Sequence, residues 1–167
     1  LGLWETPEFS TLRLFLEPLV AAMNHLQDSQ QPSSVQMIGL SGGGWTSTVY
    51  PALDPRVTRS YPTAGSLPFF LRPGSPKPSP TRGDWEQRQD RHPGFYAHAD
   101  FMDMYALGSV GANRRQIQIL NRFDECCFNG VGHRCYEAVV RHRVAVIGNG
   151  EWELLEDATH GDHTISP

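Results

Sequence analysis

Hydrophobic positions near the start of the chain recur with the period of a helix. Between residues 9 and 26, apolar side chains fall three and four positions apart, which places them along one helical face. Pro18 interrupts the pattern, and a proline inside a helix removes a hydrogen bond and crowds the preceding turn. The pattern therefore predicts a helix over residues 9–26 that kinks or restarts at Pro18.

Short apolar runs and helical patterns alternate along the rest of the chain. Strands are predicted at residues 35–38, 57–61, 115–123 and 152–155, and helices at residues 45–53, 101–107 and 135–142. Strands that alternate with helices typically form a parallel sheet. The sequence therefore predicts an α/β fold, a mainly parallel sheet with flanking helices on both of its faces.

One long segment, residues 66–98, does not fit this alternation. It contains several prolines and charges, and an irregular segment of this length is uncommon inside a domain unless it is functional or disordered. We interpret it as a lid-like excursion from a single domain that spans residues 1–167, since this length suits one domain.

Composition and charge exclude several classes of partner. Apolar residues make up 39% of the chain, enough for a core, and 14 basic against 18 acidic residues give a formal charge of −4. This balance argues against electrostatic binding of nucleic acid or of an anionic membrane surface. No apolar run reaches the roughly 18 residues of a membrane span. No signal peptide is visible, which favours the cytoplasm without deciding the compartment.

Gly39, Ser41 and Gly43 form a G-x-S-x-G pattern between a predicted strand and a predicted helix. In this context the turn is so tight that the serine is strained and its hydroxyl is pushed out over the sheet. We expect glycine to be required at both positions 39 and 43, because side chains there would collide. The Gly42 amide would face an oxyanion, assisted by the helix dipole. The pattern predicts Ser41 as a nucleophile.

Two other interpretations use the same residues. Gly39 and Gly44 have the spacing of a phosphate-binding loop, but Trp45 stands where that loop has its lysine, so nothing would neutralise the phosphates. The segment is also compatible with a plain glycine-rich turn that lets a helix pack closely on a strand.

The serine needs a base and a group that orients the base. Asp124 follows the predicted strand 115–123, and His163 lies in the loop after the predicted strand 152–155. They appear in the order serine, acid, histidine that a nucleophile elbow on a parallel sheet requires. Ile165 would anchor the loop and aim the His163 imidazole at Ser41. We therefore predict Asp124 and His163 as its partners.

Other residues compete for these two roles. The competing acids are Asp100, Asp103 and Asp157, of which Asp157 is the strongest because it precedes the histidine loop; His160 competes with His163. The run from His160 to His163 also matches half of the His-x-His-x-Asp-His pattern of metallo-β-lactamase-like hydrolases. The first histidine of that pattern falls on Ala158, so we expect no metal site there.

With Gly39 to Trp45, Asp124 and His163 in place, the chain resembles the α/β-hydrolase superfamily, which includes serine esterases, lipases and peptidases. The resemblance covers nearly the whole chain from the first helix onward. It implies a carboxylesterase-like serine hydrolase that needs no cofactor and acts on a small-molecule acyl substrate. Ser41 would attack the carbonyl, His163 would shuttle the proton and Asp124 would orient the imidazole.

The resemblance also implies parts that this sequence does not supply. In that fold several strands precede the nucleophile turn, and one of their loops provides a second oxyanion donor, each donor being worth about 3 kcal/mol. We therefore expect the C-terminal portion of a longer hydrolase, or strands that are lost or come from another chain. The uncovered sheet edge would favour association of the chain with another chain, for example with a second copy of itself in a homo-oligomer. The alternative function is a non-catalytic hydrolase-like binding or assembly module.

The segment 66–98 lies where this fold usually carries a lid. On that basis Trp85, Phe95 and Tyr96 are expected to line an acyl or leaving-group pocket, and Trp45, next to the glycine-rich turn, is expected to bind the substrate together with Trp85 and Tyr96. An unstructured surface loop is the alternative.

Cys126, Cys127 and Cys135 gather around His133, just after Asp124. Adjacent cysteines do not easily share one tetrahedral metal ion, and the spacing matches no standard zinc motif. A disulfide from Cys126 or Cys127 to Cys135 would pin the loop that carries Asp124. Buried free thiols are the other possibility, and the sequence leaves the two open.

Overall fold

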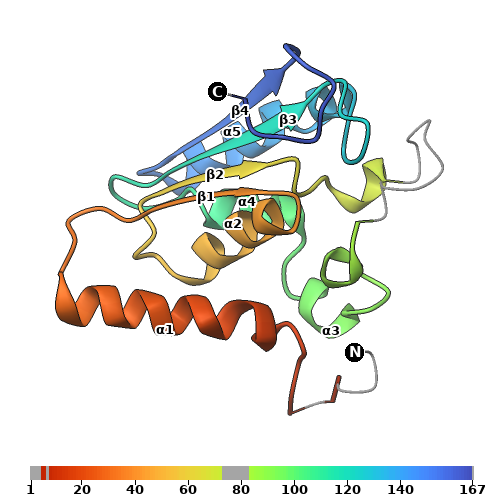
Figure 1. Cartoon of the computed structure of the whole chain (residues 1–167). Coiled ribbons are helices and arrows are strands. Elements are labelled where there is room, and N and C mark those ends of the chain that lie inside the picture. Colours follow the sequence, from red (N-terminus) through yellow and green to blue (C-terminus); the bar gives the residue numbers. More distant parts are fainter. Residues whose placement is uncertain (1–4, 7, 73–82, 167) are drawn as a thin grey trace.

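A four-stranded parallel sheet forms the centre of the computed structural model, which describes residues 5–6, 8–72 and 83–166. The strands are β1 (Gln36–Leu40), β2 (Arg59–Thr63), β3 (Arg115–Asn121) and β4 (Glu151–Asp157), and they lie in the order β1-β2-β3-β4. The four predicted strands are confirmed, with ends that differ by a few residues. Because all strands run in the same direction, their carboxyl ends meet at one edge of the sheet (Figure 1).

Four helices accompany the sheet: α1 (Arg13–Ser29), α2 (Gly42–Leu53), α4 (Phe101–Leu107) and α5 (Glu137–Ile147). Helix α2 packs on β1 and β2, α5 packs on β4, and α4 lies between α2 and α5, while α1 contacts α2 (Figure 1). Parallel neighbours are joined by right-handed crossovers. Since each new strand is added on the same side of the last, the connecting helices fall on one face.

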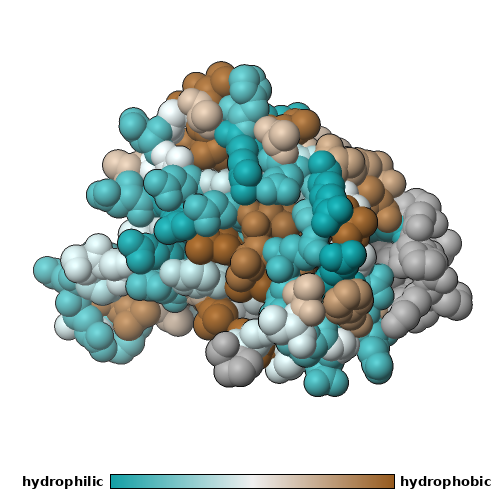
Figure 2. Space-filling model, turned by 90° about the horizontal axis from the view of Figure 1, so that it is seen from above, coloured by the Kyte–Doolittle hydropathy of each residue, from teal (hydrophilic) through white to brown (hydrophobic). Residues whose placement is uncertain are grey.

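The opposite face of the sheet is open in the described part of the chain. Met37 and Leu154 pack into the two apolar clusters beneath the sheet. Their chain neighbours Ile38 and Leu155 point the other way, and they are 62% and 53% exposed. The expectation of helices on both faces is therefore wrong for the described residues. Figure 2, which views the molecule from above, shows hydrophobic residues gathered in the middle of a largely hydrophilic surface.

Aromatic side chains dominate the core between the sheet and its helices. Tyr105 and Tyr136 stack at 5.8 Å between ring centroids, and Trp152 packs against both. The hydroxyls of the two tyrosines both bond to Gln118 of β3. The Gln118 side-chain nitrogen donates to the Tyr105 hydroxyl at 3.1 Å, and the Tyr136 hydroxyl donates to the Gln118 side-chain oxygen at 2.9 Å. The buried polar groups therefore pair with one another, which avoids the cost of desolvating them alone.

Several helix boundaries differ from the sequence prediction. Helix α1 begins at Arg13 and continues through Pro18 without restarting, although a proline beyond the first turn leaves one helical carbonyl without its N–H donor. Helix α5 continues to Ile147. None of the described helices is long and apolar enough to cross a membrane.

The segment 66–98 is largely irregular, as predicted. Its described parts contain only short helical turns, η2 (Phe69–Leu71), η4 (Trp85–Gln87) and α3 (Pro93–Tyr96). Residues 73–82 of this predicted excursion lie outside the described residues. Figure 1 shows the described parts of this segment on the side of the molecule where the strands end, and Gly83, Asp84 and Gln87 line the cavity beside Ser41, so the excursion borders the predicted site.

Candidate active site

Ser41 occupies the turn between β1 and α2 in a conformation that non-glycine residues rarely adopt. Its φ is 58° and its ψ is −120°, in a region that costs about 1–3 kcal/mol when a side chain is present. Two backbone hydrogen bonds hold it there: the Ser41 amide donates to Thr63 at 3.0 Å, and the Trp45 amide donates to the Ser41 carbonyl at 2.8 Å. The surrounding structure therefore enforces the strain that was predicted.

The glycines around Ser41 do not all serve the same purpose. A Cβ on Gly39 would lie 2.2 Å from the Gly43 carbonyl oxygen, and one on Gly44 would lie 2.4 Å from the Thr63 carbonyl oxygen. A Cβ on Gly43 would meet nothing within 4 Å. The expected need for glycine holds at position 39 but is wrong at position 43, because Gly43 points away from the strand while Gly44 touches β2.

The Gly42 amide begins the first turn of α2, where N–H groups have no partner within the helix. That is the position the sequence analysis gave to the oxyanion donor. A Cβ built on Gly42 would have a side-chain oxygen of Glu86 as its nearest neighbour, at 3.7 Å. The donor therefore lies beside an acidic side chain of the excursion.

Asp124 follows β3 and is fully buried. Its Oδ1 accepts hydrogen bonds from the amides of Cys126 at 2.7 Å and Cys127 at 2.9 Å. Its Oδ2 accepts from Nδ1 of His163 at 2.7 Å. The backbone carbonyl of Asp124 also accepts from the Asn129 side chain at 2.7 Å. These contacts fix both the loop and the direction in which the carboxylate points.

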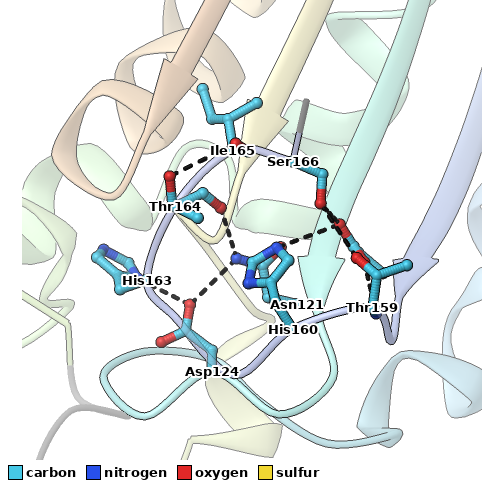
Figure 3. A network of polar contacts seen from close by, with 9 residues as sticks. Asn121, Asp124, Thr159, His160, His163, Thr164, Ile165 and Ser166 are labelled. Atoms are coloured by element: carbon cyan, nitrogen blue, oxygen red, sulfur yellow. Dashed lines mark hydrogen bonds and ion pairs between the residues drawn. The ribbon is translucent and has the colours of Figure 1, made fainter.

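His163 lies in the loop after β4, and Figure 3 shows its ring turned toward Asp124. The loop is tied to the sheet because the Asn121 side chain donates to the Thr164 carbonyl at 2.8 Å. With Nδ1 held by Asp124, the other ring nitrogen, Nε2, is buried and has no hydrogen-bond partner among the described residues. An imidazole held in this way presents an unprotonated Nε2 that can accept a proton.

A cavity of about 280 Å³ opens beside the nucleophile turn. It is lined by Ser41, Gly83, Asp84, Gln87, Cys126, Cys127 and Phe128. The two cysteines also border the histidine, since their sulfurs and a ring nitrogen of His163 all lie within 4.8 Å of one another. Ser41 and His163 therefore both lie near the cysteine pair, and no hydrogen bond joins them in the described part of the chain.

The two adjacent cysteines are bonded to each other. The disulfide joins Cys126 to Cys127, and Cys135 is free and exposed. Both possibilities that the sequence left open are therefore wrong, since no disulfide to Cys135 forms and the three cysteines are not buried free thiols. His133, which the sequence placed at the centre of the cysteines, instead has its Nε2 at 3.2 Å from a carboxylate oxygen of Glu156.

The competing acid and base at the end of β4 are engaged with each other and with their own loop. Asp157 accepts hydrogen bonds from the Thr159 amide at 2.9 Å, from the Thr159 hydroxyl at 2.6 Å and from the Ser166 hydroxyl. His160 lies 3.4 Å from Asp157. Figure 3 shows Thr159 and Ser166, which donate to Asp157, on the opposite side of the view from the His163 ring.

The other competing acids have a structural explanation as well. Asp100 and Asp103 form a reciprocal capping box at the start of α4, each side chain accepting from the other residue's amide at 3.1 Å. Such a pair satisfies two amides that the helix leaves free.

The three aromatic residues expected to bind substrate do not line the cavity beside Ser41. Trp45 and Tyr96 are buried in the core, and the Trp45 indole donates to the Tyr96 hydroxyl at 3.0 Å. The Tyr96 hydroxyl donates in turn to the Glu86 carbonyl at 2.7 Å. Trp85 packs edge-on against His92. These rings attach the excursion to α2 and to itself, and their role in substrate binding stays a prediction.

Glu86 is a residue that sequence reasoning missed. It is 7% exposed, and burial raises the pKa of its carboxyl group above the ordinary value. Its position beside Gly42 comes from the path of the excursion, and nothing in the local sequence indicates it. Asn121 was missed for the same reason, since it acts on a loop 43 positions further along the chain.

Comparison by sequence gives no relatives: no family model matches the chain, and neither does any curated protein. Comparison by structure finds several similar proteins. An acetyl xylan esterase from Paenibacillus sp. R4 is 17% identical to this chain with a TM-score of 0.55, and the match covers 90% of this chain and 47% of the esterase chain. Est1E from Butyrivibrio proteoclasticus is 12% identical with a TM-score of 0.56, covering 92% and 63%.

An acylaminoacyl peptidase from Pyrococcus horikoshii is similar to the same extent. It is 12% identical with a TM-score of 0.56, covering 88% of this chain and 23% of its own. The chain thus spans less than two thirds of the length of each of these proteins. At this level of identity the likeness concerns the arrangement of the backbone. Four parallel strands, the turn that carries Ser41 and these neighbours together show that the chain has an α/β-hydrolase-type fold.

Proposed function

We propose that the protein is a serine hydrolase that cleaves carboxylic ester or related acyl bonds. Ser41 is the nucleophile, His163 the general base and Asp124 the residue that orients the base. The observation that carries the proposal is the 2.7 Å contact between Asp124 and Nδ1 of His163, which leaves Nε2 buried and unpaired. This pair lies at the same edge of the sheet as the strained Ser41.

The proposed reaction follows from these positions. Nε2 of His163 takes the proton of the Ser41 hydroxyl while the oxygen attacks the acyl carbon. The carbonyl oxygen becomes an oxyanion, which the Gly42 amide stabilises as one donor. When the tetrahedral intermediate collapses, the protonated His163 gives its proton to the departing alcohol. Water then attacks the acyl-enzyme with His163 as base and releases the acid, which restores Ser41.

Two features of the neighbours support this class of reaction. The names of two similar structures are those of an esterase and a peptidase, and their fold is shared. Because the chain spans only part of their length, the substrate and a second oxyanion donor belong to the proposal for the whole protein.

A fluorophosphonate probe tests the proposal, because it reacts with an activated serine. We expect labelling of the folded protein at Ser41, none in Ser41→Ala, and labelling slowed by at least tenfold in His163→Gln. Ser29→Ala, at the exposed end of α1, is the matched control and should label like the wild type. A folded wild-type protein that stays unlabelled contradicts the proposal.

A second candidate is a non-catalytic binding or assembly module. The open face of the sheet favours it, since Ile38 and Leu155 remain 62% and 53% exposed and exposed apolar patches mark association surfaces. This candidate expects a stable homo-oligomer with no turnover of short p-nitrophenyl esters. Sedimentation of the folded protein, together with the labelling experiment, separates the two functions.

A further inference from the structure

The cysteine pair and His163 form a cluster that the proposed reaction does not use. Among the described residues, Cys126, Cys127 and His163 are the group whose metal-ligating atoms all lie within 4.8 Å of one another. Cys126 and Cys127 also line the cavity beside Ser41. The cluster is therefore open on one side to the space where a substrate would enter.

The donors in this cluster suit a thiophilic divalent cation. Two thiolates and one imidazole form a recognised three-ligand set for zinc, with a fourth position left for water, and cadmium prefers the same soft ligands. Sulfur ligands at about 2.3 Å from a tetrahedral ion stand roughly 3.8 Å apart. Reduction breaks the bond between the two sulfurs, which frees them to separate toward this spacing beside His163.

The surroundings of His163 also match those of a metal ligand. Histidines that bind metals usually donate their second ring N–H to a carboxylate, which fixes the tautomer and makes the ligating nitrogen more basic. Here Nδ1 donates to the buried Asp124 at 2.7 Å, and Nε2 is buried without a partner among the described residues. The nitrogen available to a cation is therefore Nε2.

We propose that Cys126 and Cys127, once reduced, form with His163 a binding site for a thiophilic divalent cation that occupies Nε2 and closes the cavity beside Ser41. In the disulfide form the two sulfurs are bonded to each other and cannot act as thiolates, so the site exists only after reduction. A phosphine reduces it: the phosphine and one water yield two thiols and the phosphine oxide. Binding of the cation then releases the two thiol protons.

The cation would also prevent hydrolysis, because Nε2 is the atom that must take the serine proton. This consequence rests on the proposed function, whereas binding itself does not. The site is therefore an inhibitory one, available under reducing conditions and absent under oxidising conditions.

Titration with cadmium alone, followed by its thiolate charge-transfer absorbance, tests the binding. We expect the phosphine-reduced protein to bind one cation per chain and the disulfide form to show no such band. Cys126→Ser and Cys127→Ser should each weaken binding at least a hundredfold, and His163→Gln at least tenfold. Cys135→Ser, which removes the exposed free cysteine, is the matched control and should bind as the wild type does. Equal binding by the two redox forms, or loss of binding in the Cys135 variant, overturns the proposal.

Alkylation of the wild-type protein gives a test that needs no variant. Iodoacetamide should modify Cys135 alone in the disulfide form and all three cysteines after reduction. Cadmium should then protect Cys126 and Cys127 but not Cys135. Failure of protection overturns the site. If protection occurs in a protein that no fluorophosphonate labels, the metal site stands and the proposed function fails.

Discussion

Two aspartates stand at the ends of neighbouring strands, and each lies beside a histidine of the same loop. Asp124 follows β3 and contacts His163 at 2.7 Å, while Asp157 ends β4 and lies 3.4 Å from His160. In sequence both pairs are credible as the acid and base of a hydrolase. The structure separates them by what else each carboxylate binds.

Asp157 is committed to its own turn. Hydrogen bonds from the Ser166 and Thr159 hydroxyls lower the pKa of its carboxyl group to about 2. Asp124 instead accepts two backbone amides on one oxygen, while its other oxygen contacts the imidazole at 2.7 Å and the Asn121 side chain at 3.5 Å. The comparison teaches that an aspartate near a histidine orients it when fixed donors hold the carboxylate and leave its shortest contact to the imidazole.

The largest expected effect comes from replacing each aspartate by asparagine. Asp124→Asn should lower kcat by about 10⁴, because an amide no longer holds the tautomer in which Nε2 accepts a proton. Asp157→Asn should change kcat less than tenfold. Hydrolysis of a short p-nitrophenyl ester by the protein that carries this chain measures both. A larger loss in the Asp157 variant would reverse the assignment.

Asn121 provides the second test, because its side-chain nitrogen ties the histidine loop to β3 and also donates to Oδ2 of Asp124 at 3.5 Å. Asn121→Ala removes the 2.8 Å hydrogen bond to the Thr164 carbonyl and should lower kcat about tenfold while costing about 1 kcal/mol of stability. Asn24→Ala, which removes an exposed contact of α1 with Arg56, is the control. Equal kcat in the two variants would show that the loop needs no such anchor.

Asp157 should matter for folding, and the third test measures this. A carboxyl group whose pKa is lowered on folding adds stability above its unfolded pKa, near 3.8, and this is lost as the pH falls toward about 2. Asp157→Asn should therefore cost about 1–2 kcal/mol at pH 7, allowing for screening by solvent, and less below pH 3. Urea unfolding at both pH values gives the difference, which a pH-independent cost would contradict.

Glu86 gives the smallest effect and the opposite sign. Burial raises the pKa of its carboxyl group above the ordinary 4.5, so the folded state favours the protonated form, and its contribution to stability declines above pH 4.5 and is lost as the pH rises through the raised pKa of the folded state. Glu86→Gln should gain stability relative to the wild type between pH 4 and pH 7. Thermal unfolding across that range measures the gain. A variant that falls behind the wild type over this interval would show that the ionised form has a partner.

The sequence predicted those parts of the molecule that depend on short-range patterns. Apolar runs located all four strands, and the G-x-S-x-G turn located Ser41, because sterics within a few residues determine both. The side of the sheet that carries the helices was not predictable in this way. It depends on the strand order β1-β2-β3-β4, which is a property of the whole chain.

Pairings between distant segments were also beyond the local pattern. Trp45 and Tyr96 each look like residues for a pocket, and only their 3.0 Å hydrogen bond across 51 positions shows that they belong to the core. The pairing of Cys126 with Cys127 was missed because the two residues are too close in sequence, not too far apart. They are adjacent, so a bond to the more distant Cys135 appeared better suited to closing a loop.

The backbone of Ser41 has a consequence for protein engineering. Its φ of 58° is one that glycine adopts freely. The Ser41→Gly variant should therefore have a free energy of unfolding that is higher than that of the native chain by about 1 kcal/mol or more. Laboratory selection for thermal endurance alone would therefore discard the hydroxyl, whereas selection for turnover would keep it. In a library of variants at position 41, selection for stability should enrich glycine and selection for turnover should enrich serine.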